Sequence, residues 1–269
     1  MSKDKRPSTK ASIIIPTYNE VENVGELINA LAKVASSARI DMEVIIVDDG
    51  STDGTMNIIE GLRGRYGNLK VLLRPGKMGL GSAYRDGMGL AQGEIVIQMD
   101  ADLSHRPEDI PRLLRALSEA DLAIGSRYVP GGCVVGWSPL RLMISRVANL
   151  LARFLLRLGI KDATSGFRAW RKEAFMACAN ASRCCGYDFQ VEMAFLAREL
   201  GLRIKEIPIT FVGRRKGDSK LTPLDILSFL KSILSMVGRG RGGRPSPSHE
   251  KANKEDLLGR IGHAEGVQV

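Results

Sequence analysis

The sequence predicts an α/β fold with a mainly parallel, doubly wound sheet flanked by helices. Short apolar segments alternate with longer amphipathic ones along the first half of the chain, and this alternation is typical of strands joined by crossover helices. The expected strands end just before Pro16, Asp49, Asp100 and Arg127. Because the carboxyl ends of parallel strands meet at one edge of a sheet, we expect these residues to line a ligand site there.

The strands are expected where apolar runs end in turn residues. These runs cover residues 12–15, 43–47, 69–73, 94–99, 122–124 and 204–211. Helices are expected where apolar residues recur at helical spacing, with Asn19 as a cap for the first and Pro107 in the first turn of a later one. They cover the segment after Asn19, residues 55–65, the segment from Gly81 through Ala91, and residues 107–119, 140–158, 187–200 and 222–237.

Three segments differ in composition. A short basic lead covers residues 1–11, and a folded domain covers residues 12–237. Within that domain, the glycine-rich segment 129–139 predicts a mobile loop, and residues 164–168 predict another loop. Residues 238–269 are rich in Gly, Arg, Pro and Ser, so we expect a disordered, basic tail.

Composition limits the functional class. The formal net charge of +9 over 269 residues favours anionic partners such as phosphates, nucleic acid or an acidic membrane surface. Aromatic residues are scarce and no zinc-finger spacing or recognition helix stands out, which argues against nucleic acid. No run of apolar residues is long enough to span a membrane, and the amino terminus lacks an apolar signal core. The four cysteines show no metal-binding spacing and are expected to be reduced thiols of a cytosolic protein.

Asp100 and Asp102 form the most informative pair of residues. They follow the buried run 94–99 one residue apart, at the expected ligand edge of the sheet. Two carboxylates suit Mg²⁺ or Mn²⁺, which typically binds one or two carboxylates together with substrate phosphates. An isolated Asp-x-Asp is more often a solvated turn, so the assignment depends on the rest of the chain.

Two amphipathic helices and a cationic loop distinguish the second half. In the helix 140–158, arginines at positions 146, 153 and 157 share one face and apolar residues cover the remainder. The helix 222–237 carries a polar stripe in an otherwise apolar surface. Each helix could pack into a core, but two of them in a basic chain favour contact with a membrane surface. The loop 214–221 has the charge and the central glycine to grip phosphate oxygens, although such a charge run can also be simply solvated.

Other nucleotide and metal motifs do not match. The first strand leads into Pro-Thr-Tyr-Asn-Glu and not into a glycine fingerprint, and no Walker A sequence occurs. The segment Asp-Asp-Gly-Ser-Thr-Asp-Gly resembles the start of a calcium loop, but Ile59 stands near the position that requires an acidic ligand.

Taken together, the motifs resemble the catalytic domain of family 2 glycosyltransferases, in the branch of the dolichyl-phosphate mannose synthases. The similarity covers residues 12–237, and its specificity comes from the order and spacing of several motifs. They are IIIPTYNE, VDDGSTDGT, GLGSAY, MDADLSH, GSRY, SPLRLMISRVAN, TSGFRAWRKEAF, GYDFQVEM and RRKGDSKL.

The resemblance implies a GT-A fold that binds a nucleotide sugar, and it assigns roles to matching residues. Guanosine would be held by Pro16, Tyr18, Glu20, Val47 and Asp49. Asp100 and Asp102, with the Ala101 backbone, would bind the metal and the diphosphate. The donor and acceptor phosphates would meet Arg127, Arg214 and Lys220, and the lipid phosphate would also meet Arg141 and Ser145. Asp102, Arg127 and Arg214 would be the catalytic residues. Ser104 stands where some relatives have a metal-binding Gln, so the third metal ligand stays open.

The implied reaction transfers mannose from GDP-mannose to dolichyl (polyprenyl) phosphate with inversion. The expected location is the cytoplasmic face of a membrane, the endoplasmic reticulum in a eukaryote or the plasma membrane in a prokaryote. Helices 140–158 and 222–237 would lie at the membrane surface. Small membrane subunits are further expected partners, and nucleic acid is not an expected partner. Three alternatives remain open: a dolichyl-phosphate transferase that uses a UDP-sugar, a non-catalytic nucleotide-sugar or membrane-binding module, and nucleic-acid binding through the tail.

Overall fold

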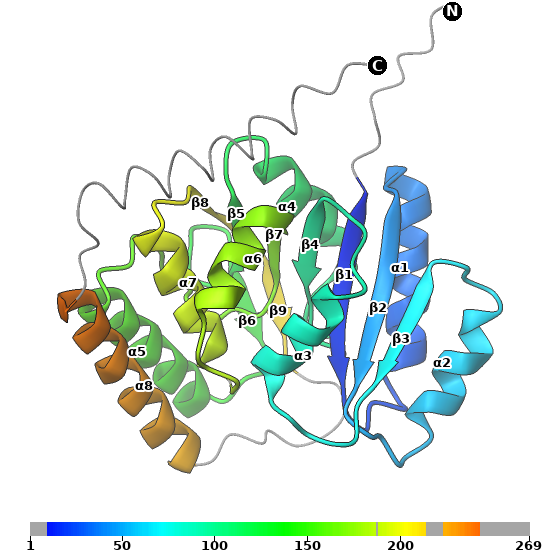
Figure 1. Cartoon of the computed structure of the whole chain (residues 1–269), viewed down its shortest axis with the longest axis horizontal. Coiled ribbons are helices and arrows are strands. Elements are labelled where there is room, and N and C mark those ends of the chain that lie inside the picture. Colours follow the sequence, from blue (N-terminus) through cyan, green and yellow to red (C-terminus); the bar gives the residue numbers. More distant parts are fainter. Residues whose placement is uncertain (1–9, 187, 214–222, 243–269) are drawn as a thin grey trace, which may run out of the picture.

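The computed structural model describes residues 10–186, 188–213 and 223–242 (Figure 1). A seven-stranded sheet has the order β3-β2-β1-β4-β7-β5-β8. All of its described strand pairs are parallel except those made by β7, which runs antiparallel to both β4 and β5. The strands are β1 Ala11–Thr17, β2 Met42–Asp48, β3 Leu69–Leu73, β4 Ile95–Gln98, β5 Leu122–Ser126, β7 Arg168–Arg171 and β8 Ile204–Pro208. The expected mainly parallel sheet is confirmed.

Helices cover both faces of this sheet, as the alternation of apolar residues along β1 requires. Ile13 and Ile15 face one core, which contains residues of α1, α2 and α4. Ile14 faces the other, which contains residues of α3, α5, α6, α7 and α8. The helices are α1 Val24–Ala38, α2 Thr55–Arg63, α3 Leu80–Met88, η1 Pro107–Asp109, α4 Ile110–Ala116, α5 Pro139–Leu155, α6 Lys172–Ala181, α7 Phe189–Glu199 and α8 Pro223–Gly242.

A second, two-stranded sheet joins segments that are distant in sequence. Strand β6 (Cys133–Val135) pairs in parallel with β9 (Thr210–Val212). The segment expected to be a loop over 129–139 therefore contains a strand. The expected strand over 204–211 is divided, because its first part joins the large sheet as β8 and its end joins β6 as β9.

Several boundaries differ from expectation. Residues 168–181 form β7 and α6, neither of which the apolar pattern predicted. Helix α1 begins at Val24, and Asn19 does not cap it. Arg157 adopts a left-handed backbone conformation beyond the end of α5, so only Arg146 and Arg153 remain on the expected cationic face of that helix. Helix α8 extends to Gly242, past the expected domain boundary at Val237.

Candidate active site

The carboxyl ends of β1 and β2 form the first part of the site. In the parallel register Pro16 lies beside Val47 and Thr17 beside Asp48, so the two segments expected to hold a nucleoside are neighbours. The Val47 side chain is fully buried in the core, which leaves its main chain as the part that can reach a ligand. Tyr18 follows directly, and the ammonium of Lys77 lies 3.8 Å from its ring centre.

Hydrogen bonds join the loop after β1 to the loop after β2. The backbone N–H groups of Asn19 and Glu20 donate to the hydroxyls of Ser51 and Thr55, both at 2.9 Å. In return, the Asn19 side-chain oxygen accepts from the Thr52 N–H at 3.0 Å. The role of Asn19 is therefore to connect the two loops. Its φ of 55° is a left-handed conformation that asparagine tolerates better than most residues.

Asp49 is held by an arginine that the sequence did not single out. Arg74 follows β3, and its guanidinium lies 2.5 Å from the Asp49 carboxylate. It also donates to Ser82 at 2.7 Å and to Asp86 at 3.0 Å, both in α3. Because Arg74 is nearly buried, it fixes Asp49 and α3 to each other at this edge.

Asp100 and Asp102 lie on a tight turn after β4. The Asp102 carboxylate is buried and accepts from both the backbone N–H, at 3.1 Å, and the hydroxyl of Ser104. Leu103 between them has a φ of 59°, a strained conformation for a non-glycine residue. Asp100 exposes 37% of its side chain, so the two acids differ: one is fixed within the turn and the other faces solvent.

The loop 164–167 packs directly behind Asp100. A Cβ atom on Gly166 would lie 3.3 Å from both carboxylate oxygens of Asp100, so glycine permits this close approach. The fully buried Arg168 holds the loop by donating to the carbonyls of Ser165, Ala163 and Gln190 at 2.6–2.8 Å. Burial lowers the pKa of Arg168 to about 10, which leaves it charged at neutral pH.

His105 closes the turn on its other side. Its ring stacks on Phe167, with ring centres 5.1 Å apart, and meets the edge of Phe211 at 5.2 Å. Burial lowers the pKa of His105 to about 4, although the nearby Asp102 charge acts in the opposite direction. The imidazole is therefore neutral at pH 7. Its Nδ1 lies 3.7 Å from the Asp100 carboxylate, and the contact is not an ion pair in that state.

The acidic turn fits a metal that arrives with a substrate. Among the described residues, no three His, Cys, Asp or Glu side chains form a group that could enclose a metal ion. Mg²⁺ characteristically uses one or two protein carboxylates and completes its shell with water and substrate phosphates. The exposed Asp100 and the fixed Asp102 supply that kind of partial donor set.

Arg127, after β5, forms a buried ion pair that the sequence did not predict. Its guanidinium donates to both carboxylate oxygens of Asp162, at 2.8 and 2.6 Å, and to Thr164 at 2.7 Å. Burial would raise the pKa of Asp162, but the Arg127 charge and hydrogen bonds outweigh it and lower that pKa below its ordinary value. Arg127 is thus oriented by Asp162, and its charge is largely balanced there.

Aromatic rings bring the other expected phosphate residues to Arg127. The Arg127 guanidinium lies 5.5 Å from the Trp137 ring centre, and the Arg141 guanidinium lies 4.2 Å from the same centre. The Tyr128 hydroxyl donates to the Ser145 hydroxyl at 2.7 Å. The structure therefore brings Arg127, Arg141 and Ser145 into one neighbourhood.

Arg214 and Lys220 lie outside the described residues. The segment that directly precedes them lies next to the acidic turn, because the Val212 N–H donates to the Ser104 carbonyl at 3.0 Å. Ring contacts also connect the two parts of the site, since Phe211 touches His105 on one side and lies 5.4 Å from the Arg127 guanidinium on the other.

Besides His105 Nδ1, buried polar atoms near the site that have no hydrogen-bond partner among the described residues include the Tyr84 hydroxyl and the Trp137 indole N–H. Burial, and the negative charge of Asp100, raise the pKa of Tyr84 well above its ordinary value. Neither residue was predicted from the sequence, because an isolated aromatic residue gives no local signal of its polar atom.

Comparison with known proteins agrees with this architecture. The model of glycosyl transferase family 2 matches residues 12–178. An undecaprenyl-phosphate mannosyltransferase of Micrococcus luteus is 44% identical over 213 residues, which are 78% of this chain and 86% of that protein. A polyprenol monophosphomannose synthase of Mycolicibacterium smegmatis is 40% identical over 242 residues, 88% of this chain and 90% of that protein.

Among solved structures, glucosyl-3-phosphoglycerate synthase from Mycobacterium tuberculosis, in complex with Mn²⁺, UDP and glucosyl-3-phosphoglycerate, has a TM-score of 0.64 at 21% identity. The match covers 87% of this chain and 81% of that one. At this identity the similarity establishes the fold alone, which is the GT-A fold expected from the sequence. The family match covers more than half of the chain, and the chain therefore belongs to glycosyl transferase family 2.

Proposed function

We propose that this protein transfers mannose from GDP-mannose to a polyprenyl phosphate such as dolichyl phosphate, giving a β-linked mannosyl phosphate. The observation that carries the proposal is the meeting of two groups at one sheet edge. The acidic turn of Asp100 and Asp102 is joined through His105 and Phe211 to the cationic group around Arg127. The names of the two relatives support mannose as the sugar and a polyprenyl phosphate as the acceptor.

The arrangement suits a reaction whose nucleophile is already ionised. A phosphate monoester carries roughly −1.5 to −2 charges at pH 7, so its oxygen can attack the sugar without a general base. This agrees with the neutral, enclosed His105 and with an Asp102 that is fixed by Ser104. Attack in line with the departing diphosphate inverts the sugar carbon, so an α-linked donor gives a β-linked product.

Leaving-group departure is the demanding step, because negative charge develops on the nucleoside diphosphate. A divalent metal held by Asp100 and Asp102 would supply positive charge at that point. Asp49, fixed by Arg74, and the main chain of Val47 would orient the nucleoside. Arg127 keeps its position through Asp162 and would set the electrostatic field across the reacting phosphates.

The acceptor phosphate has candidate partners on the other side of Arg127. Arg141 offers a guanidinium, Ser145 a hydroxyl and Trp137 a buried N–H without a described partner. By the family resemblance, Arg214 and Lys220 would complete this set. We propose that the enzyme works at the cytoplasmic face of a membrane with α5 and α8 at the surface, alone or with small membrane subunits. Among the described residues, no helix is long and apolar enough to cross a membrane.

The proposal is tested by a donor and acceptor screen that reads out radiolabelled lipid. Purified protein with Mg²⁺ or Mn²⁺ is given GDP-mannose, UDP-glucose or UDP-GlcNAc, each with dolichyl or undecaprenyl phosphate. We expect labelled lipid only from GDP-mannose, and none after chelation of the metal. Product from a UDP-sugar alone would establish the alternative transferase. Vesicle binding without any product would favour a non-catalytic module.

A further inference from the structure

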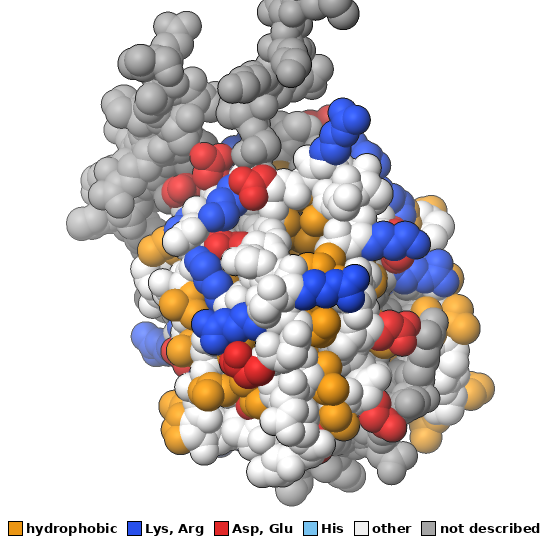
Figure 2. Space-filling view, turned by 90° about the vertical axis from the view of Figure 1, so that its right-hand side faces the viewer, with side chains coloured by type: hydrophobic (Ala, Val, Ile, Leu, Met, Phe, Trp, Pro, Cys, Tyr) orange, Lys and Arg blue, Asp and Glu red, His pale blue; other side chains and the backbone are white. Residues whose placement is uncertain are grey.

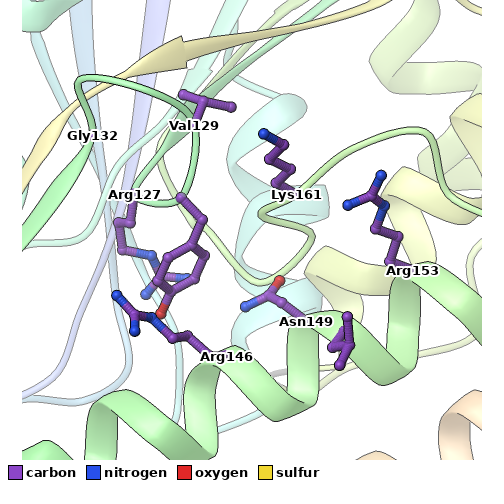
Figure 3. Close-up of a pocket in the computed structure, with 9 residues that line it drawn as sticks. Arg127, Val129, Gly132, Arg146, Asn149, Arg153 and Lys161 are labelled. Atoms are coloured by element: carbon purple, nitrogen blue, oxygen red, sulfur yellow. The ribbon is translucent and has the colours of Figure 1, made fainter.

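A basic pocket lies beside the site, between α5 and the loop that follows β5 (Figure 3). Its volume is about 370 Å³, roughly a dozen times the share of one water molecule in the liquid. This is more room than a lone phosphate group needs. The polar side chains in its lining belong to Arg127, Tyr128, Arg146, Asn149, Arg153 and Lys161.

The charge of this pocket is strongly one-sided. Four of the lining residues are cationic and none is acidic. Arg127 is balanced by Asp162, but Arg146, Arg153 and Lys161 add three positive charges around one space. In Figure 3, the two arginines extend from α5, Arg146 toward Arg127, and Lys161 lies on the loop beyond that helix. Several positive charges around one space favour an anion, because the positive charges repel one another until an anion binds between them.

The pocket borders an exposed apolar surface. Leu150 lines the pocket and belongs to a row of exposed apolar side chains along α5, in which Val147 is 49% exposed and Phe154 is 72% exposed. Arg146 and Arg153 are seven residues apart in the same helix, so they follow one side of this row. An apolar face bordered by arginines is the arrangement of helices that lie in a membrane interface, with apolar side chains among the acyl chains and cations at the phosphates.

The pocket is separate from most of the expected acceptor site. Neither Trp137 nor Arg141 contributes to its lining. Tyr128 does, and its hydroxyl is already engaged with Ser145. An anion in the pocket would therefore contact Arg146, Arg153 and Lys161, to which the family resemblance gave no role.

We propose that this pocket binds the phosphate headgroup of an anionic phospholipid that does not take part in the reaction. The headgroup would hold α5 at the membrane surface while the apolar row enters the interface. The inference deepens the proposed function, since it names the lipid surface that would present the polyprenyl phosphate. A basic residue near an anionic membrane contributes about 1 kcal/mol, which is roughly a fivefold change in partitioning.

The test measures flotation of the full chain with vesicles of phosphatidylcholine, with and without phosphatidylglycerol. The pocket variant is Arg146→Gln/Arg153→Gln, and the control is Lys33→Gln/Arg115→Gln, which removes two exposed charges elsewhere. We expect the pocket variant to lose about 25-fold in partitioning to phosphatidylglycerol vesicles. The control should stay within twofold of the unmodified protein. All three proteins should unfold at the same temperature, since the four side chains are exposed.

Other results would overturn the proposal. Equal losses in the pocket variant and the control would make the attraction a property of net charge, and no loss in either would remove the pocket from membrane binding. A further assay tells whether the pocket binds a phospholipid headgroup or the reacting phosphate itself. It measures mannosyl transfer to a short, water-soluble polyprenyl phosphate. If the pocket variant loses that activity as strongly as activity in vesicles, the pocket binds the reacting phosphate. If the unmodified protein transfers no mannose but the vesicle results hold, the proposed function fails and the headgroup site stands.

Discussion

The helices at the two ends of the sheet differ in how far their apolar side chains are buried. At the β1–β2 end, α1 buries its large apolar residues, and Leu27 and Leu31 are fully enclosed. Seen from the side on which α2 lies, the small hydrophobic areas are interspersed with charged side chains (Figure 2). At the other end, α5 carries six of the twelve large hydrophobic side chains that are exposed among the described residues: Leu140, Met143, Val147, Leu150, Phe154 and Leu155.

This difference shows that amphipathic spacing alone does not tell what an apolar face contacts. Helices α1 and α5 have similar amphipathic patterns, but the first packs on the sheet and the second turns most of its apolar residues outward. An exposed apolar patch on a protein commonly marks a surface that binds a protein, a ligand or a membrane. The β1–β2 end of the molecule is accordingly closely packed, whereas α5 presents an apolar surface to its surroundings.

The largest expected effect lies at the boundary between the two ends. Asp102→Asn keeps an oxygen for the Ser104 N–H but removes the negative charge, so transfer should fall by at least about 1,000-fold, or about 4 kcal/mol in the barrier. The thermal midpoint should stay within about 2 °C. A mannosyl-transfer assay measures the first effect, thermal unfolding the second, and a Mn²⁺ titration the loss of metal binding. An active Asp102→Asn enzyme would refute the metal assignment. In parallel, Ser104→Ala should cost less than tenfold if Ser104 only orients Asp102.

Next in size is a direct comparison of buried and exposed leucines. Leu31→Ala should destabilise the fold by about 2–5 kcal/mol, because it opens a cavity in the core. Leu150→Ala, at a side chain that is 52% exposed, should change stability by less than about 0.5 kcal/mol. Urea unfolding measures both. For vesicle partitioning we expect the reverse order: Leu150→Ala should lose more than Leu31→Ala. A large loss of stability in Leu150→Ala would mean that α5 is a core helix.

A pH effect is expected from Glu43 in β2. Burial raises the pKa of Glu43, but hydrogen bonds from Lys70, Ser12 and Gln92 outweigh it and lower that pKa to about 2 from an ordinary 4.5. The carboxylate therefore stabilises the fold above pH 4.5, and this contribution is lost as the pH falls toward 2. The loss should be about 2 kcal/mol by urea unfolding between pH 6 and pH 3. Glu43→Gln should be less stable at pH 6 and should lack this part of the pH dependence.

The smallest expected effect concerns the acceptor. Trp137→Phe keeps most of the ring under Arg141 but removes the indole N–H, which has no partner in the described part of the chain. The KM for polyprenyl phosphate should therefore rise about fivefold, or about 1 kcal/mol. The KM for GDP-mannose should not change. Trp170 is a suitable control, since its N–H already donates to Gln98 at 2.8 Å within the core. Trp170→Phe should lower stability without a selective effect on the acceptor.

The strands at the β1–β2 end and their neighbours at the sheet edge could be predicted from the sequence, for a physical reason. Strands buried on both faces, such as β2, are continuous apolar runs, and parallel pairing then fixes which residues meet at the edge. The neighbours Pro16 and Val47, and the acidic turn after β4, follow from that pattern. The membrane-facing role of the amphipathic helices remains a prediction.

The parts that could not be predicted depend on distant partners. Strand β7 has an arginine at each end, Arg168 and Arg171, so it shows no apolar pattern although it lies inside the sheet. Arg168 can be buried because backbone carbonyls of other segments accept its hydrogen bonds. Asp162 and Arg74 are single charged residues outside regular elements, and their importance comes from Arg127 and Asp49, which only the folded chain brings near them.

The position of β7 has a consequence for how the chain becomes functional during synthesis. Among the described strands, β5 pairs only with β7 and β8, both of which leave the ribosome after it. Until residues 168–171 are made, β5 has no partner in the sheet and one edge of β4 stays open. The acidic turn follows β4 and Arg127 follows β5, so the two parts of the site are synthesised early but united late. A nascent chain that ends before β7 can form β1, β2 and β3, but it cannot yet assemble the candidate site.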